Sequence, residues 1–217
     1  MVKKPHTVYK DKSGMRLPGV TTITGELGWN KQVLVGWANR LGLQGIDSRS
    51  FVDDKAAIGT LGHAFVLEHH GGPKVETSDY SKNQIDQAQN CLKSYWAWEQ
   101  GKEIKPVLME APLVSEIHKF GGIPDNLALV NGKLTLLDYK TGKGIYEEYY
   151  IQVAGGYLIL LEEAGYKVED VMILNIPRSD DESFQTKNIA PALWPACKAI
   201  FLNCLENYYM KKLLKGE

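Results

Sequence analysis

Apolar and polar residues alternate along two adjacent stretches in the middle of the chain, 123–130 and 133–140. A period of two is typical of β-strands, because successive side chains of a strand point to opposite faces of the sheet. Asn131 and Gly132 separate the stretches, and this dipeptide favours a two-residue turn in which both residues take positive φ. The pattern predicts an antiparallel hairpin, followed by a helix that begins near Tyr146.

The helix is predicted because apolar residues recur every three or four positions after the hairpin. Four of them form a stripe that we expect to be buried: Ile151, Ala154, Leu158 and Leu161. Gln152 lies off this stripe and can face away from the core. Gly155 and Gly156 each lower helix stability by roughly 1 kcal/mol relative to alanine. We therefore expect the helix backbone to pack closely against the sheet at these glycines.

The rest of the chain is assigned from the same periodicities and from turn residues. The predicted elements are a hairpin over 6–17, helices over 20–28, 31–45, 53–69, 81–100 and 192–214, strands over 105–117 and 168–176, and a polar, mobile loop over 179–187. The helix over 31–45 carries Trp37 on an apolar face, so we expect this indole in the core.

This order of elements predicts an α/β fold with a mixed central β-sheet flanked by helices. A length of 217 residues fits one domain over 1–217. Within it we expect an N-terminal hairpin and helices in 1–50, the core in 51–178 and a closing helix in 190–217.

Composition excludes several classes of protein. No apolar run is long enough to span a membrane, and no signal-peptide pattern follows Met1. The 3 cysteines form neither a disulfide framework nor a close metal-binding spacing. We therefore expect a cytoplasmic protein with no membrane partner.

Two carboxylates and a lysine gather at one end of the predicted hairpin. Asp138 and Lys140 are two residues apart on the second strand, so they share a face. Pairing about the turn sets Asp125 opposite Asp138. Carboxylate oxygens bind hard divalent cations, and such cations with a nearby lysine can support phosphodiester hydrolysis. A solvated ion pair between Asp138 and Lys140 is the alternative.

Three stretches occur in a recognisable order: GGIPD ending at Asp125, LLDYKTG containing Asp138 and Lys140, and QVAGGY from Gln152 to Tyr157. Together they resemble the PD-(D/E)XK nuclease superfamily, and most of all its RecB-like, phage-type exonuclease branch. The resemblance implies a restriction-endonuclease-like core with an N-terminal helical elaboration.

An earlier stretch, GTLGHAFVLE over 59–68, resembles the glycine-led helix of that branch, which carries a histidine. The resemblance implies two bound Mg²⁺ or Mn²⁺ ions with these ligands: His63, Asp125, Asp138 and the backbone carbonyl of Tyr139. The cysteines that hold an iron–sulfur cluster in some of these nucleases are missing, so we expect no iron–sulfur cluster.

The resemblance also assigns roles to residues that do not bind metal. Lys140 would orient or help deprotonate the attacking water and stabilise charge on the phosphate, with Gln152 supporting the lysine or the phosphate. The branch commonly shows Gln-x-x-x-Tyr, whereas Tyr157 comes one residue later, so a DNA contact and a packing role both stay open for it. Glu68 and Glu110 are weaker site candidates. For Trp37, stacking on bases is the alternative to its expected place in the core.

The expected function is a metal-dependent DNA exonuclease in recombination, repair or phage DNA processing. A structure-specific endonuclease of the same fold and a catalytically silent DNA-binding or assembly subunit are the alternatives. The net charge of −1 does not indicate a DNA partner, so basic contacts must be local. The terminal lysines are candidates: Lys3, Lys4, Lys10, Lys12, Lys211, Lys212 and Lys215. The sequence does not reveal whether an oligomer forms.

Overall fold

The computed structural model describes residues 7–216, so His6, Lys3 and Lys4 of the predicted hairpin and basic N-terminus lie outside the described residues. The first half of this range folds into a short hairpin and four helices: β1 (Tyr9–Lys10), β2 (Arg16–Leu17), α1 (Val20–Thr24), α2 (Lys31–Leu43), α3 (Ser48–His69) and α4 (Lys82–Glu99). The hairpin and the four helices occur where the sequence predicts them, although α1 is shorter and α3 begins at Ser48, before the predicted start at Asp53.

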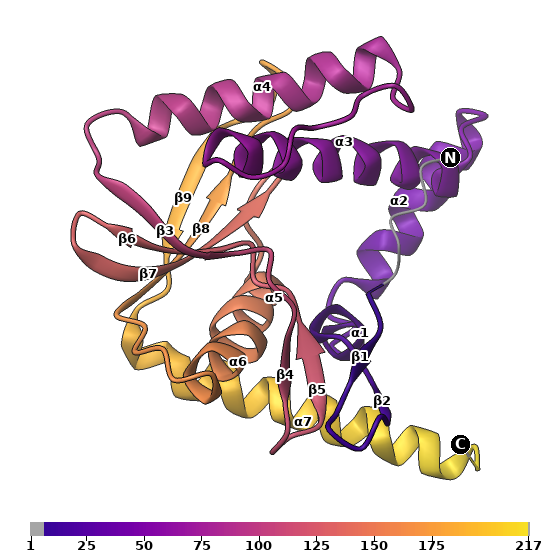
Figure 1. Cartoon of the computed structure of the whole chain (residues 1–217). Helices are drawn as coiled ribbons and strands as arrows, with labels where there is room; N and C mark the ends of the chain where they lie inside the picture. The colour runs from indigo at the N-terminus through magenta and orange to yellow at the C-terminus, as the bar shows by residue number, and fades with distance from the viewer. Residues whose placement is uncertain (1–6, 217) are drawn as a thin grey trace.

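A five-stranded mixed sheet forms the centre of the molecule, in the order β3–β6–β7–β8–β9. Its strands are β3 (Ile104–Met109), β6 (Asn126–Val130), β7 (Lys133–Lys140), β8 (Asp170–Asn175) and β9 (Gln185–Asn188). Strands β7 and β8 are parallel, and the other neighbours are antiparallel. Helices cover both faces of this sheet (Figure 1), which confirms the predicted fold class.

The central hairpin has the predicted turn. Asn131 has a φ of 50° and Gly132 a φ of 83°, as a two-residue hairpin turn requires. Val130 pairs with Lys133, and Asn126 pairs with Leu137. This register brings Asp125, at the bend just before β6, opposite the end of β7 where Asp138 lies.

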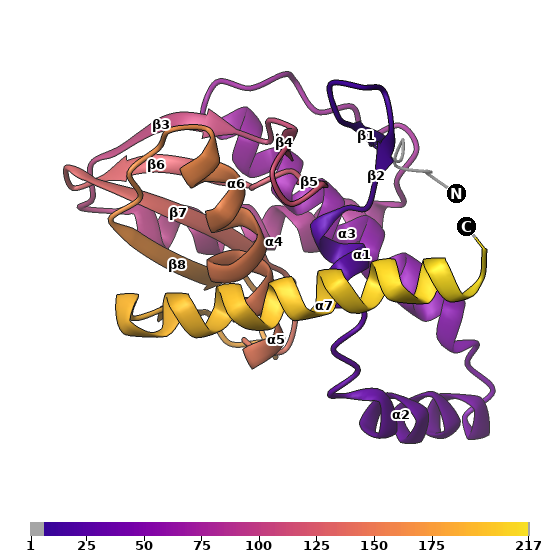
Figure 2. The same cartoon turned by 90° about the horizontal axis from the view of Figure 1, so that it is seen from below.

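The second half of the chain supplies the helices on the other face of the sheet. They are α5 (Glu147–Tyr150), the π-helix η1 (Ile151–Tyr157), α6 (Leu158–Glu163) and the closing helix α7 (Trp194–Leu214). In Figures 1 and 2 α3 and α4 lie over one face of the sheet, and α6 and α7 over the opposite face. None of the helices within residues 7–216 has both the length and the apolar content needed to cross a membrane.

Strand β7 is buried on both faces. Leu136 packs in the cluster formed with η1, α6 and α7, whereas Leu137 packs in the cluster formed with α4. Side chains alternate along a strand, so Asp138 and Lys140 share the face of Leu136, and Tyr139 shares that of Leu137. The carboxylate and the ammonium therefore point toward η1, away from α4.

The apolar stripe of the helix after β7 is buried as predicted, but its two glycines pack against different partners from those expected. A Cβ on Gly155 would lie 2.8 Å from the carbonyl oxygen of Cys197 in α7, and one on Gly156 would lie 2.7 Å from Val20 in α1. The prediction of close packing against the sheet is wrong, because η1 is covered by helices at this point. Two flanking helices reach its backbone only where side chains are missing.

Two further boundaries differ from the predictions. The strand predicted over 105–117 divides into β3 and a separate β4 (Leu113–Ser115), which pairs with β5 (Phe120–Gly122). The break falls at Glu110, where φ is 41°, outside the β region that a continuous strand needs. The polar loop predicted over 179–187 contains the start of the edge strand β9, whose residues pair with β8.

Candidate active site

The end of β7 carries a buried acid and a lysine in direct contact. Asp138 is 1% exposed, and its Oδ2 atom lies 2.6 Å from Nζ of Lys140. The ammonium also lies 5.0 Å from the ring centroid of Tyr149, in the turn of α5. The alternative of a solvated ion pair is wrong, because the acid is enclosed by protein.

Asp125 approaches the same place from the preceding bend. Its Oδ2 atom accepts a hydrogen bond of 2.8 Å from the backbone N–H of Tyr139. Its Oδ1 atom lies 3.5 Å from Nδ1 of His63, which α3 supplies. The Tyr139 ring packs against His63 with centroids 5.8 Å apart, so only the main chain of Tyr139 is available to the carboxylates.

These four groups, which we call the carboxylate cluster, are His63, Asp125, Asp138 and Lys140. Burial raises the pKa of Asp138 to about 6, and Asp125 adds to this effect while Lys140 opposes it. Burial also disfavours the charged forms of the other three groups, but the charged neighbours of each group favour its charged form more strongly. The pKa of Asp125 is lowered, and those of His63 and Lys140 are raised. Asp138 is therefore the member whose charged form the cluster disfavours.

The donor set fits a divalent cation. Three buried side-chain atoms among the described residues have no hydrogen-bond partner, and two of them are the oxygens of Asp138. The third is Oδ1 of Asn126, next to Asp125. Oδ2 of Asp138 has the Lys140 ammonium as its ion-pair partner at 2.6 Å, whereas Oδ1 has no partner in the described part of the chain. Carboxylate oxygens are suitable ligands for Mg²⁺ and Mn²⁺, and a buried oxygen without a partner calls for an explanation such as a bound ion.

A tighter group of possible ligands lies elsewhere, and we call it the imidazole cluster: His69, His70 and Glu99. Its ligand atoms lie within 4.8 Å of one another, which the carboxylate cluster does not achieve. However, Nδ1 of His69 accepts a hydrogen bond from the indole N–H of Trp96. The ring must then carry its proton on Nε2, 2.6 Å from Glu99 Oε2, so that nitrogen has no lone pair for a metal. This cluster is satisfied by hydrogen bonds.

Gln152 faces the carboxylate cluster from η1. Its Nε2 atom donates a hydrogen bond of 3.0 Å to the hydroxyl of Tyr157, five residues later. In an α-helix residues five apart point about 140° away from each other. The wider turn of a π-helix, with its i→i+5 bonding, instead brings them much closer to the same side of the helix. The unusual spacing of the glutamine and the tyrosine is therefore compensated by the local backbone, and Tyr157 is both buried and close to the site.

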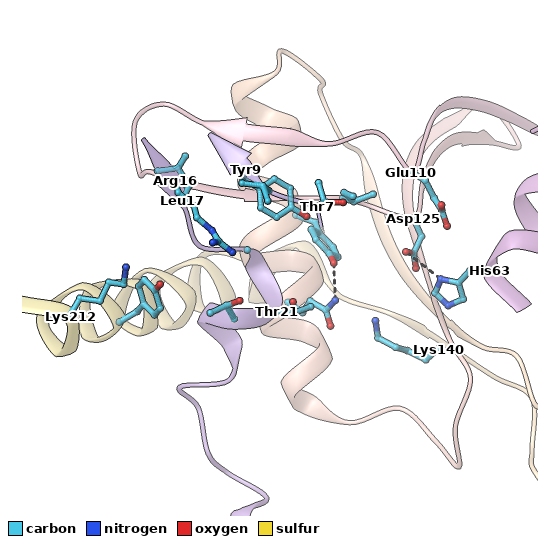
Figure 3. Close-up of a pocket in the computed structure, with 17 residues that line it drawn as sticks. Thr7, Tyr9, Arg16, Leu17, Thr21, His63, Glu110, Asp125, Lys140 and Lys212 are labelled. Carbon is cyan, nitrogen blue, oxygen red and sulfur yellow. Dashed lines mark hydrogen bonds and ion pairs between the residues drawn. The ribbon is translucent and has the colours of Figure 1, made fainter. Parts of the chain in front are cut away.

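A cleft of about 890 Å³ opens at this cluster, and we call it the hairpin cleft because β1 and β2 form its far wall. His63, Asp125 and Lys140 lie at one end of it in Figure 3, and Arg16 and Lys212 at the other. Sequence reasoning missed Arg16, because its two-residue strand carries no chemical pattern.

The two weaker site candidates, Glu110 and Glu68, differ in whether they line the hairpin cleft. Glu110 lines the hairpin cleft, and its backbone N–H donates to the carbonyl oxygen of Asp125. Glu68 does not line this cleft, because its carboxylate accepts a hydrogen bond from the backbone N–H of Val75. Among the described terminal lysines, Lys212 lines the cleft, whereas Lys211 pairs with Glu26 at 2.7 Å.

The prediction that Trp37 belongs to the core is wrong. No residue of α2 is buried, and Figure 2 shows this helix projecting from the body of the molecule. Trp37 packs against the ring of Phe51 at the start of α3, with centroids 5.9 Å apart. The two rings line a second cleft that also reaches Lys140.

Comparison with known proteins gives distant structural similarity only. No protein-family model matches the chain, and no curated protein sequence matches it. A candidate exonuclease from Eubacterium rectale is 11% identical with a TM-score of 0.45, over 74% of this chain and 68% of that one. LHK-Exo, an alkaline exonuclease from Laribacter hongkongensis, is 16% identical with a TM-score of 0.35, over 73% and 85%. LHK-Exo in complex with dAMP is 15% identical with a TM-score of 0.34, over 76% and 92%.

Proposed function

We propose that this protein is a metal-dependent deoxyribonuclease that acts as an exonuclease. One observation carries the proposal: the half-buried Asp125 and the buried Asp138 meet Lys140 at the end of an open cleft, and among the described residues the only partner of the Asp138 carboxylate is the Lys140 ammonium. The ordered sequence stretches from Asp125 to Tyr157 support DNA as the substrate.

The ligands proposed for two Mg²⁺ or Mn²⁺ ions are Asp125, Asp138, His63 and the main-chain carbonyl of Tyr139. When bound, these ions supply Lewis acidity toward the phosphate and lower the pKa of a water molecule. The protein's own part begins with Asp138, which lies behind Lys140 and is nearly inaccessible from the clefts. The ammonium must therefore leave Oδ2 before a cation reaches this acid.

Lys140 and Gln152 act on the reacting groups. A displaced Lys140 ammonium carries three donors and a positive charge, which orient the attacking water and stabilise charge that develops on the phosphate. Gln152 uses its N–H on Tyr157, so its carbonyl oxygen can accept a hydrogen bond from Lys140 or the water. The hydrogen bond from Tyr139 to Asp125 holds that carboxylate in place.

The test is digestion of end-labelled DNA, single- and double-stranded, linear and circular, with Mg²⁺ or Mn²⁺. An exonuclease degrades linear DNA and leaves closed circles intact. Cleavage of circles indicates an endonuclease of the same fold, and no cleavage of any substrate with either ion contradicts the proposal and favours a silent DNA-binding subunit. Asp138→Asn serves as the inactive control, and EDTA removes the metal.

A further inference from the structure

The carboxylate cluster opens on two sides. His63 and Lys140 line the hairpin cleft, and they also line the second cleft, of about 550 Å³. We call the second one the aromatic cleft, because the rings of Trp37, Phe51 and Tyr149 lie along it. A polymer whose phosphate reaches Lys140 therefore has room for its chain on both sides of the reacting bond.

The two clefts differ in their chemistry. The hairpin cleft is lined by groups of both charges, the acids Glu110 and Asp125 and the basic residues Arg16, Lys140 and Lys212, together with several hydroxyl groups. None of the described residues that line the aromatic cleft is acidic, whereas four are basic: Lys55, Lys140, Lys143 and Arg178. Two of these are paired with acids: the half-buried Lys140 with Asp138, and the buried Arg178 with Glu182.

The remaining cations are accessible. Lys143 is exposed and forms no ion pair with any described residue, and Lys55 lies 3.9 Å from Asp54 and 5.6 Å from the centroid of the Phe51 ring. Phe51 is 37% exposed. Aromatic rings that are at least partly exposed, next to lysines at the surface, form the kind of site on which unstacked bases and their phosphates bind.

We propose that the aromatic cleft binds the bases of a single strand of nucleic acid next to the scissile phosphate. The proposal rests on the function proposed above, because it assigns the substrate strand of that same site. Rings of this kind favour a single strand over a duplex, since duplex bases are already stacked on each other and present only their edges. The volume of the cleft is within the range of pockets that enclose a small ligand.

The matched variants are Trp37→Ala and Trp29→Ala. Both replace an indole in the N-terminal region, but Trp29, 52% exposed, lines neither cleft. Since α2 has no buried residue, we expect Trp37→Ala to fold, which circular dichroism checks. Trp37→Phe keeps an aromatic face and should retain most of the binding.

The measurement is fluorescence anisotropy of a labelled oligothymidine and of a blunt duplex, both with Ca²⁺ in place of the active metal. Trp37→Ala should weaken binding of the single strand roughly 5- to 100-fold and binding of the duplex less than twofold, while Trp29→Ala matches the wild type. Equal affinities of Trp37→Ala and Trp29→Ala for the single strand overturn the inference, as does a wild type that does not bind it.

The binding and cleavage measurements together distinguish a failure of the aromatic-cleft proposal from a failure of the proposed function. A wild type that binds single strands through Trp37 and cleaves no DNA with Mg²⁺ or Mn²⁺ contradicts the proposed function and leaves the aromatic cleft as a binding site. A wild type that cleaves DNA, while Trp37→Ala binds as tightly as Trp29→Ala, contradicts the aromatic cleft alone.

Discussion

Helix α3 places histidines next to acids at two points, with opposite results. In the carboxylate cluster His63 meets Asp125, while the oxygens of Asp138 have no hydrogen bond. In the imidazole cluster the ring nitrogens of His69 bond to Trp96 and Glu99. The second cluster is the more compact, yet the cation site that we propose is the first. The difference lies in the ligand atoms, because both ring nitrogens of His69 are used in hydrogen bonds whereas Oδ1 of Asp138 has no partner within residues 7–216.

The largest expected difference between the clusters is in cleavage. Asp138→Asn removes a proposed ligand and should lower the rate of DNA cleavage by at least roughly 10³-fold, because metal ions contribute several kcal/mol to the transition state. Glu99→Gln, in the imidazole cluster, should stay within twofold of the wild type. Single-turnover digestion of end-labelled DNA measures both. Cleavage by Asp138→Asn within tenfold of the wild type would overturn the site.

The variant Lys140→Ala tests the role of the lysine separately from the role of the two acids in the carboxylate cluster. Cleavage should fall on the order of 10²- to 10⁴-fold, the scale of a positioned electrostatic or acid–base group. Metal should bind at least as tightly as in the wild type, because the ammonium no longer competes for Asp138.

Isothermal titration calorimetry with Mn²⁺ measures the metal affinity of the variant, and single-turnover digestion of DNA measures its cleavage rate. Lys140→Arg should recover only part of the activity, since the guanidinium is larger and keeps its proton. A Lys140→Ala protein that loses metal as completely as Asp138→Ala would show that the lysine holds the site together.

The two histidines offer a direct test of the comparison. His63→Ala should raise the Mn²⁺ concentration needed for half-maximal cleavage by about tenfold, because imidazole is a suitable ligand for Mn²⁺. His69→Ala should leave that concentration unchanged, because its nitrogens already have partners. Metal titrations of the cleavage rate give both numbers. Identical curves for His63→Ala and the wild type would return His63 to a structural role.

The smallest expected difference is in the stability of the metal-free protein. The pKa of Asp138 is raised to about 6, above its usual value of about 4. The folded state therefore holds this proton more tightly than the unfolded state, so the stability it contributes is lost as pH rises from about 4 to about 6. Asp138→Asn should be more stable than the wild type at pH 8, by up to about 3 kcal/mol, and close to it at pH 4.

Thermal denaturation in EDTA at the two pH values tests this prediction. Glu99→Gln should instead lower the melting temperature at pH 8, because it removes the charged acceptor to which His69 donates. A difference between Asp138→Asn and the wild type that is the same at pH 4 and pH 8 would contradict the raised pKa.

The central hairpin and the meeting of its acids could be predicted from the sequence, because both depend on local rules. A two-residue turn fixes the register of its strands, and this register alone places Asp125 opposite the end of β7. The shared face of Asp138 and Lys140 follows from the period of a strand.

Other features depend on contacts between distant segments, which periodicity does not report. The apolar face of α2 looks like a core face in the sequence, but the chain leaves it open beside the aromatic cleft. The break at Glu110 follows its backbone bond to Asp125. The close neighbours of Gly155 and Gly156 come from α7 and α1, far away in the sequence.

The five-residue step from Gln152 to Tyr157 has a consequence for the recognition of related chains. The π-helix absorbs one additional residue as a local widening of a single turn, so α5 before it and α6 after it continue in α-helical form. One residue inserted in this turn changes the number of residues between the glutamine and the tyrosine, but the two side chains still meet. A search that demands a fixed number of residues between the glutamine and the tyrosine will overlook chains that keep the contact and have lengthened the turn.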